Sequence, residues 1–236
     1  MKKILTIASL LACSFAAPAG DFDFAATSNA QDFNAIVRDL TAALGYKAMH
    51  PAETGGIAGI EVAAIVTYAP TQEDDAWRRM TGSSVDELGM AGLRGIKGLP
   101  LGLEIGAFYS AIPGTGAKLL GGEVRYAILE GGVASPAVAI RGAYSRLQGV
   151  DDLDFDSRSL DVSISKGFTL LTPYGGIGRV WADATGEITS GREKANHEDT
   201  RLFAGVRIGL GLLDITPEYE RVGDNDVFNV LVGLSF

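Results

Sequence analysis

The feature that most constrains this chain is a strict alternation of apolar and other residues that runs to its last position. In the final segment, one face carries Phe228, Val230, Val232, Leu234 and Phe236. Because successive side chains of a strand point to opposite faces, this period of two predicts β-structure. The pattern recurs from Ile57 onward and is interrupted by turns rich in glycine, proline and aspartate.

Ten segments follow this pattern, and most exceed the five or six residues usual for a soluble strand. The predicted strands cover residues 57–68, 88–97, 100–112, 117–130, 135–147, 157–169, 171–183, 200–211, 213–222 and 226–236. Their lengths fit the 9–11 residues of a tilted strand that spans a membrane.

Long and short connections alternate between these strands. The long or acidic ones cover 69–87, 112–117, 148–156, 184–199 and 223–225, and the short ones cover 98–99, 131–134 and positions near 170 and 212. Short turns at one end, longer loops at the other and an even strand number are typical of bacterial outer-membrane barrels. We therefore predict an all-β fold, an antiparallel transmembrane β-barrel of about ten strands, with eight or twelve as alternatives.

The direction of the polar face distinguishes a membrane barrel from a soluble one. A soluble lipocalin-like barrel turns its apolar face inward, whereas a membrane barrel turns it toward lipid. Charges of both signs in mid-strand favour a polar lumen. The predicted lumen charge network comprises Glu61, Glu104, Glu123, Arg125, Arg141, Asp161, Arg179, Arg201, Arg207, Glu218 and Glu220. Because side chains fill most of a ten-stranded interior, these groups either pair with one another or line a narrow, gated pore.

Aromatic residues gather near the predicted strand ends, as expected for the two girdles at headgroup level. The predicted girdle comprises Tyr68, Tyr109, Tyr126, Tyr144, Phe168, Tyr174, Trp181, Tyr219 and Phe236. Trp181 departs from the pattern, because strict alternation places it on the same face as Arg179.

The N-terminal leader, the alternating strands and the terminal Val232 to Phe236 together resemble bacterial outer-membrane β-barrel proteins of Gram-negative bacteria. The resemblance covers residues 57–236 at the level of architecture, and no motif assigns a subfamily. It implies that Phe236 acts as an assembly signal read by the barrel-assembly machinery. It also implies a location in the bacterial outer membrane, with membrane lipid and lipopolysaccharide as partners.

Residues 1–19 have the composition of a signal peptide. Two lysines precede a short apolar run, and Ala17 to Ala19 offer a small-x-small cleavage site. An alternative interpretation makes Cys13 the acylated residue of a lipoprotein. Beyond this leader, no apolar run reaches the 18 or so residues that a membrane-spanning helix needs.

Between the leader and the first strand, residues 20–56 form a separate helical segment. An amphipathic helix is predicted over residues 31–45, with Ser28 or Asn29 as its N-cap. Its apolar stripe consists of Phe33, Ile36, Val37, Leu40 and Leu44. This stripe must be buried, so the helix plugs the lumen, covers the periplasmic mouth or lies on the inner headgroup surface.

Two groups of residues are candidate sites of chemistry. The acidic run Asp151, Asp152, Asp154 and Asp156 offers oxygen ligands to a divalent ion or to lipopolysaccharide-bound ions, but it lacks the glycine and glutamate of an EF-hand. His197 and Asp199 resemble the aspartate–histidine pair of ten-strand omptin proteases. Their order departs from the omptin Asp-x-His pattern, so we do not expect an enzyme.

Composition excludes further classes. The net charge of −9 disfavours a nucleic-acid-binding protein, and one cysteine with two histidines disfavours a metal centre. No cofactor motif is present. We expect a non-enzymatic membrane-structural barrel or a narrow porin-like channel for a small solute. Surface binding or adhesion through acidic extracellular loops is the alternative.

Overall fold

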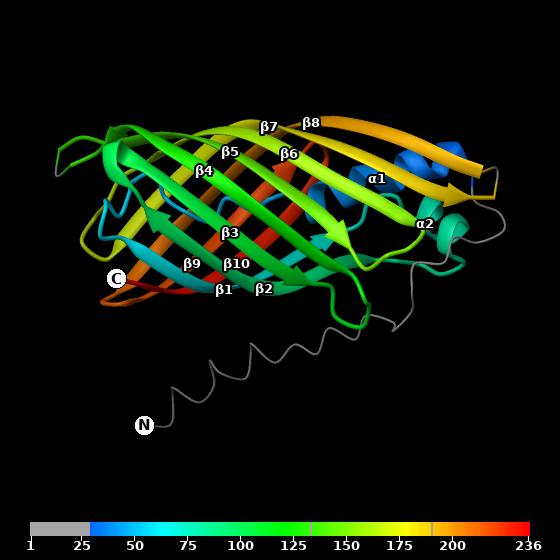
Figure 1. The fold of residues 1–236 in the computed structure, drawn as a ribbon, viewed down its shortest axis with the longest axis horizontal. Coiled ribbons are helices and arrows are strands. Elements are labelled where there is room, and N and C mark those ends of the chain that lie inside the picture. Colours follow the sequence, from blue (N-terminus) through cyan, green and yellow to red (C-terminus); the bar gives the residue numbers. More distant parts are fainter. Residues whose placement is uncertain (1–28, 133, 190) are drawn as a thin grey trace, which may run out of the picture.

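The computed structural model describes residues 29–132, 134–189 and 191–236, and within them ten antiparallel strands close into a barrel (Figure 1). The predicted fold class is therefore confirmed. The expected signal peptide and Cys13 lie outside the described residues.

The strands follow one another around the barrel in chain order. They are β1 (Ile60–Pro70), β2 (Glu87–Gly98), β3 (Leu103–Ala111), β4 (Lys118–Glu130), β5 (Ala137–Gln148), β6 (Leu153–Ser165), β7 (Leu171–Ile188), β8 (Gly191–Leu210), β9 (Leu213–Val222) and β10 (Asn225–Ser235). The barrel closes where β1 pairs with β10, in a register that joins Glu61 to Ser235 and Tyr68 to Phe228.

The two ends of the barrel differ. One end carries the start of β1, the end of β10, the short turns and the 3-10 helix η1 (Pro100–Gly102). The other carries the β1–β2, β3–β4, β5–β6, β7–β8 and β9–β10 connections, including helix α2 (Asp74–Thr81). Since outer-membrane barrels have short periplasmic turns and longer extracellular loops, we call the first end the inner mouth and the second the outer mouth.

Two predicted loops are much shorter in the structure, because the flanking strands extend into them. Residues 184–199 do not form a loop, because β7 and β8 pair as far as Ile188 and Gly191. Ala182, Ala184 and Ala195 on this hairpin are buried in the same apolar cluster as the N-terminal helix, which explains why the ladder continues. Likewise β6 begins at Leu153, so the predicted loop over 148–156 is shorter than expected.

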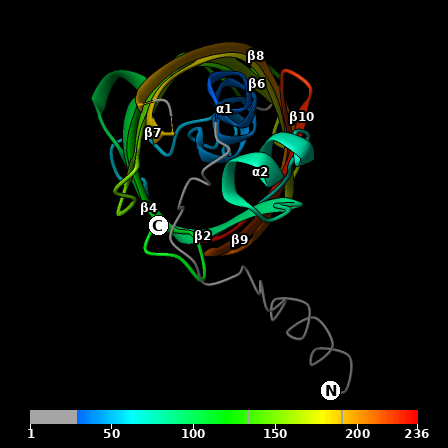
Figure 2. The ribbon, with the colours of Figure 1, turned by 90° about the vertical axis from the view of Figure 1, so that its right-hand side faces the viewer.

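The predicted N-terminal helix is present as α1 (Ala30–Leu44). The side chain of Asn29 caps it by accepting a hydrogen bond from the backbone N–H of Asp32 at 3.0 Å. Viewed along the barrel axis, α1 lies inside the ring of strands and α2 lies beside it across the outer mouth (Figure 2). In the described part of the chain, neither helix is long and apolar enough to cross a membrane.

The outer face of the barrel is apolar around its circumference. Exposed side chains on it include Val62, Leu93, Ile105, Val124, Ile128, Leu160, Val162, Ile164, Ile177, Leu202, Val230 and Leu234. In a soluble protein such a continuous apolar surface would be buried, whereas a membrane barrel presents it to lipid. The outward direction of this face therefore excludes the soluble lipocalin-like alternative.

Candidate functional site

The lumen is occupied by the N-terminal part of the chain. After α1, residues 45–59 run through the interior as an extended segment, which we call the lumen segment, and join β1 at the inner mouth (Figure 1). Wall side chains bind its backbone along its length. Met49 N–H donates to Glu218 at 2.7 Å, and Gly55 N–H donates to Glu104 at 2.9 Å.

The outer half of the interior is apolar. The stripe of α1 predicted from the sequence is completely buried there, against side chains from many strands. Members of this apolar cluster include Phe33, Ile36, Val37, Leu40, Leu44, Trp77, Met80, Leu88, Met90, Leu119, Leu147, Phe155, Val180, Val227 and Leu231. Phe33 packs so closely on Gly186 that a Cβ at Gly186 would lie 2.5 Å from its ring. The helix and the wall therefore form one continuous hydrophobic core.

The inner half of the interior is charged. Arg94 pairs with Glu123 at 3.1 Å, and Arg141 pairs with Asp161 at 2.8 Å. Arg201 bridges two acids, at 2.7 Å from Glu220 and 3.3 Å from Asp161. These side chains are nearly inaccessible to solvent, so each charge depends on its partner.

Arg125 connects the wall to the lumen segment. It forms an ion pair with Glu104 and donates to the carbonyl oxygens of Pro51 and Glu53, the latter at 3.1 Å. His50 contacts the same guanidinium and lies 3.4 Å from Glu61. One arginine of the wall thus contacts three residues of the lumen segment, His50, Pro51 and Glu53.

Two other side chains of the lumen segment complete the network. Lys47 pairs with Glu220 at 3.2 Å. The ring of Tyr46 lies 5.8 Å from the guanidinium carbon of Arg94 and 5.9 Å from that of Arg141, within cation–π range. It also packs edge-on against Phe108, with ring centroids 5.0 Å apart.

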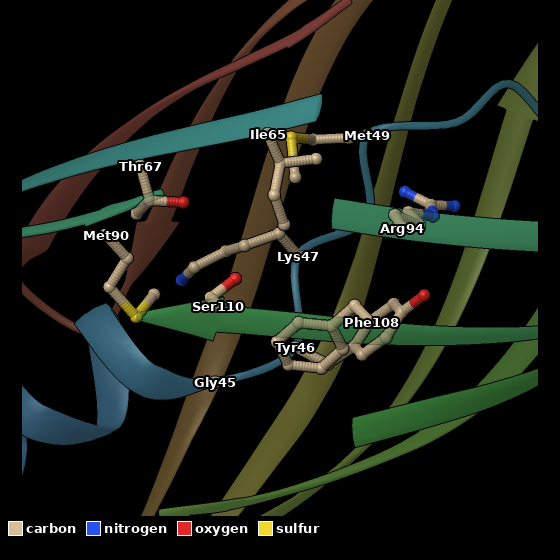
Figure 3. Close-up of a pocket in the computed structure, with 10 residues that line it drawn as sticks. All are labelled: Gly45, Tyr46, Lys47, Met49, Ile65, Thr67, Met90, Arg94, Phe108 and Ser110. Carbon is tan, nitrogen blue, oxygen red and sulfur yellow. The ribbon is translucent and has the colours of Figure 1, made fainter. Parts of the chain in front are cut away.

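A small cavity remains beside Tyr46 (Figure 3). Figure 3 shows Lys47 and Met49 entering it from the lumen segment, and Phe108 and Ser110 from β3. It has room for about one water molecule. A second depression opens at the inner mouth, where His50, Glu61 and Arg207 are among the lining residues.

Ten of the eleven predicted lumen charges face the interior, and Arg179 does not. The Arg179 side chain is 55% exposed on the outer face, where it pairs with Glu198 at 2.9 Å. The prediction placed the odd-numbered residues of β7, including Arg179, in the lumen, because it expected inward side chains to be polar along the whole strand. Val180, Ala182 and Ala184 face inward instead, since α1 fills the outer half with apolar side chains.

The same error of phase explains Tyr174. It was predicted in the inner aromatic girdle, but it is buried in the lumen and donates to Glu218 at 2.8 Å. The outer face does carry exposed aromatic side chains at Tyr109, Tyr126, Tyr144, Phe168, Trp181, Tyr219 and Phe236, with Tyr68 partly exposed. Tyr174 is thus the one member of the predicted set that is buried in the lumen.

Several lumen groups were not predicted from the sequence. Arg94 was missed because β2 has mixed faces, with Leu88 and Met90 on the inward face that Arg94 shares. Lys47 and His50 lie outside any strand, so alternation gives no signal for them. Asp214, at the start of β9, lies 3.3 Å from Arg207.

A buried carboxylate links α1 to the outer loops. Asp39 accepts hydrogen bonds from the Trp77 indole at 2.8 Å and the Asn225 amide at 2.6 Å. It also accepts from the backbone N–H groups of Gln72 and Glu73, at 3.1 and 3.2 Å. Asp39 therefore ties α1 to the β1–β2 connection and to β10 at the outer mouth.

A second contact joins the two helices. Asp32 receives two hydrogen bonds from Arg79 of α2, at 2.7 and 2.8 Å. This bidentate contact with a cation holds the pKa of the Asp32 carboxyl below its usual value.

The remaining candidate groups lie near the outer mouth. Asp154 and Asp156 lie on β6 rather than in a loop, and Asp154 is 3.5 Å from Arg192. Among the described residues, no group of three or more His, Cys, Asp or Glu side chains is arranged to hold a metal ion. His197 and Asp199 both lie on β8 and pair with each other at 2.8 Å.

Comparison with known proteins gives structural matches only. No protein-family model matches the chain, and no curated protein matches it. The N-terminal β-barrel domain of Pseudomonas aeruginosa OprF matches with a TM-score of 0.41 and 13% identity, over 77% of this chain and 99% of that one. The KdgM porin in complex with disordered oligogalacturonate gives 0.38 and 11%, over 75% and 99%. Ail, the attachment invasion locus protein of Yersinia pestis, gives 0.36 and 14%, over 75% and 99%.

The class of this protein follows from its own architecture. Ten antiparallel strands close without an edge, and their apolar face points outward. In lipid every backbone polar group must be paired, and closure of the sheet meets that requirement. The chain is a small β-barrel protein of the bacterial outer membrane.

Proposed function

We propose that the protein is a non-enzymatic, membrane-structural barrel whose lumen is closed by its own N-terminal residues. The observation that carries this proposal is the occupation of both halves of the lumen by residues 30–59. Helix α1 fills the outer half and the lumen segment fills the inner half, where its backbone is bound by Arg125, Glu104 and Glu218. An open pore would need these contacts to break.

Planar-bilayer conductance of the intact mature protein tests this proposal. We expect the barrel to insert and show no discrete current steps at moderate voltage. Insertion is checked independently by the change in gel mobility on heating. Frequent, stable steps from the intact protein would contradict a closed lumen.

A second candidate function is a gated, narrow channel for a small solute. It is favoured by the inner half, where polar contacts hold the lumen segment: Arg125 donates to the carbonyl oxygens of Pro51 and Glu53, and Lys47 pairs with Glu220. Replacing Arg125 and Arg141 with glutamine should then produce current steps that the intact protein lacks. Arg146→Gln is the matched control, because Arg146 is exposed. If the variant with Arg125 and Arg141 replaced shows no current steps, like the Arg146→Gln control, the result would argue for a purely structural barrel.

Partners follow from the faces of the barrel. The outward apolar band contacts membrane lipid. We further propose lipopolysaccharide as the partner of the outer loops, and the barrel-assembly machinery as the reader of Phe236. Phe236 is 63% exposed beyond the end of β10, which leaves it available for such recognition.

A further inference from the structure

The direction in which the N-terminal residues pass through the lumen has a consequence for topology. Contacts along the chain give this direction in order. Asp32 binds Arg79 of α2 at the outer mouth, and Phe33 packs on Gly186 near the tip of the β7–β8 hairpin. The first described residues therefore lie at the outer mouth.

Later residues lie progressively deeper. The carbonyl of Leu44 accepts from Ser145 at 3.0 Å, in the outer part of β5. Ala52 N–H donates to Ser165 at 3.0 Å, at the inner end of β6. Ile60 then pairs with Phe236 at the inner mouth. The chain thus crosses the whole barrel once before its first strand begins.

We infer that the chain threads its own barrel, and that the start of α1, from Asn29 onward, is presented at the cell surface. This surface presentation of α1 goes beyond the closure proposed above. The inner mouth is the periplasmic one, because both ends of the strand sequence lie there with the short turns. The lumen segment leaves the lumen at its periplasmic end, where β1 begins. Because it crosses the lumen once, α1 begins at the extracellular end.

The surface of α1 at the outer mouth is consistent with contact with water. Gln31, Asn34 and Arg38 are exposed, whereas the other face of the helix is buried. Asn29 is also exposed, and its side chain caps the N-terminal end of α1. The start of α1 is therefore an exposed, polar position.

Cysteine labelling on intact cells tests the inference. The Gln31→Cys variant is treated with a membrane-impermeant maleimide, and labelling of the barrel is compared with the parent chain. Ser84→Cys in the β1–β2 connection serves as the surface control. Ser135→Cys in the turn between β4 and β5 serves as the periplasmic control. All three positions are exposed.

We expect Gln31→Cys and Ser84→Cys to be labelled on intact cells to a similar extent, and Ser135→Cys only after the outer membrane is permeabilised. Labelling of Gln31→Cys only after permeabilisation would overturn the inference. Labelling of Ser135→Cys on intact cells, without Ser84→Cys, would overturn it as well.

Discussion

The two halves of the barrel interior are closed by different means. In the outer half, α1 presents an apolar stripe to apolar wall residues such as Leu119 and Leu231. In the inner half, an extended backbone is held by arginines and acids of the wall, with Arg125 at the centre. Apolar packing tolerates small shifts of position, whereas buried ion pairs require their partners.

The two halves therefore contribute differently to the register of the lumen segment and to the stability of the filled barrel. A helix can be held by hydrophobic burial alone because its backbone groups are already paired within it. An extended segment has unpaired N–H and C=O groups, so the wall must supply partners, as Glu104, Glu218 and Ser165 do. The charged half therefore determines the register of the lumen segment, and the apolar half contributes most of the free energy of burial.

The largest expected effect comes from breaking the charged half. Arg125→Met leaves Glu104 buried without its cation, which should lower the free energy of unfolding by about 3–5 kcal/mol. The double variant Arg125→Met with Glu104→Met should recover a large part of that loss. Denaturant unfolding in lipid vesicles, followed by tryptophan fluorescence, measures both. Equal losses in the single and double variants would show that the ion pair is not the cause.

A smaller effect is expected from the apolar half. Leu40→Ala removes a fully buried side chain between α1 and the wall, which should cost about 3 kcal/mol in the free energy of unfolding. Asn34→Ala, on the exposed face of α1, should change it by less than about 0.5 kcal/mol. Similar values for the two variants in the same vesicle assay would mean that α1 is not packed into the barrel.

The smallest effect concerns the contact between α1 and α2. The pKa of Asp32 is lowered in the folded state, so its contribution to stability is present above the unfolded pKa near 4 and disappears as pH falls through the folded pKa. The contribution is small because Arg79 is half exposed.

Asp32→Asn should therefore lose stability slightly at pH 7 and show a flatter decline between pH 4 and pH 2 than the parent protein. Arg79→Gln should reproduce that profile. Unfolding midpoints across this pH range provide the measurement. Parallel declines in the parent and both variants would assign the acid sensitivity to other carboxylates.

The comparison also explains what sequence reasoning could and could not predict. Alternation with a period of two identified all ten strands, because one face of each strand is exposed to lipid. The amphipathic stripe likewise identified α1. The rule that inward residues are polar holds only in the inner half, where no helix fills the lumen. It therefore failed at Arg179 on β7 and, because all residues of a strand share one phase, also at Tyr174. Arg94 on β2 was overlooked because Leu88 and Met90 share its inward face.

The contacts of the lumen segment were beyond the reach of such patterns. Lys47 and His50 belong to no periodic element, and their partners are distant in sequence, such as Glu220 and Glu61. Only the closed arrangement of strands brings them together. His197 and Asp199, in contrast, are two residues apart on β8, and their contact at 2.8 Å is local in sequence.

The seam between β1 and β10 bears on how such a molecule is assembled. It joins the first strand to the last, with Glu61 opposite Ser235, so it cannot form until the final strand has been made. While β1 and β10 are unpaired, residues 30–56 can pack sideways against the open, curved sheet before the remaining strands enclose them. Once the seam is shut, the same residues would have to be pushed lengthwise through a finished ring, with every charge desolvated on the way. Residues 30–56 must therefore be in place before the barrel closes around them. Pairing of β1 with β10 then prevents their release.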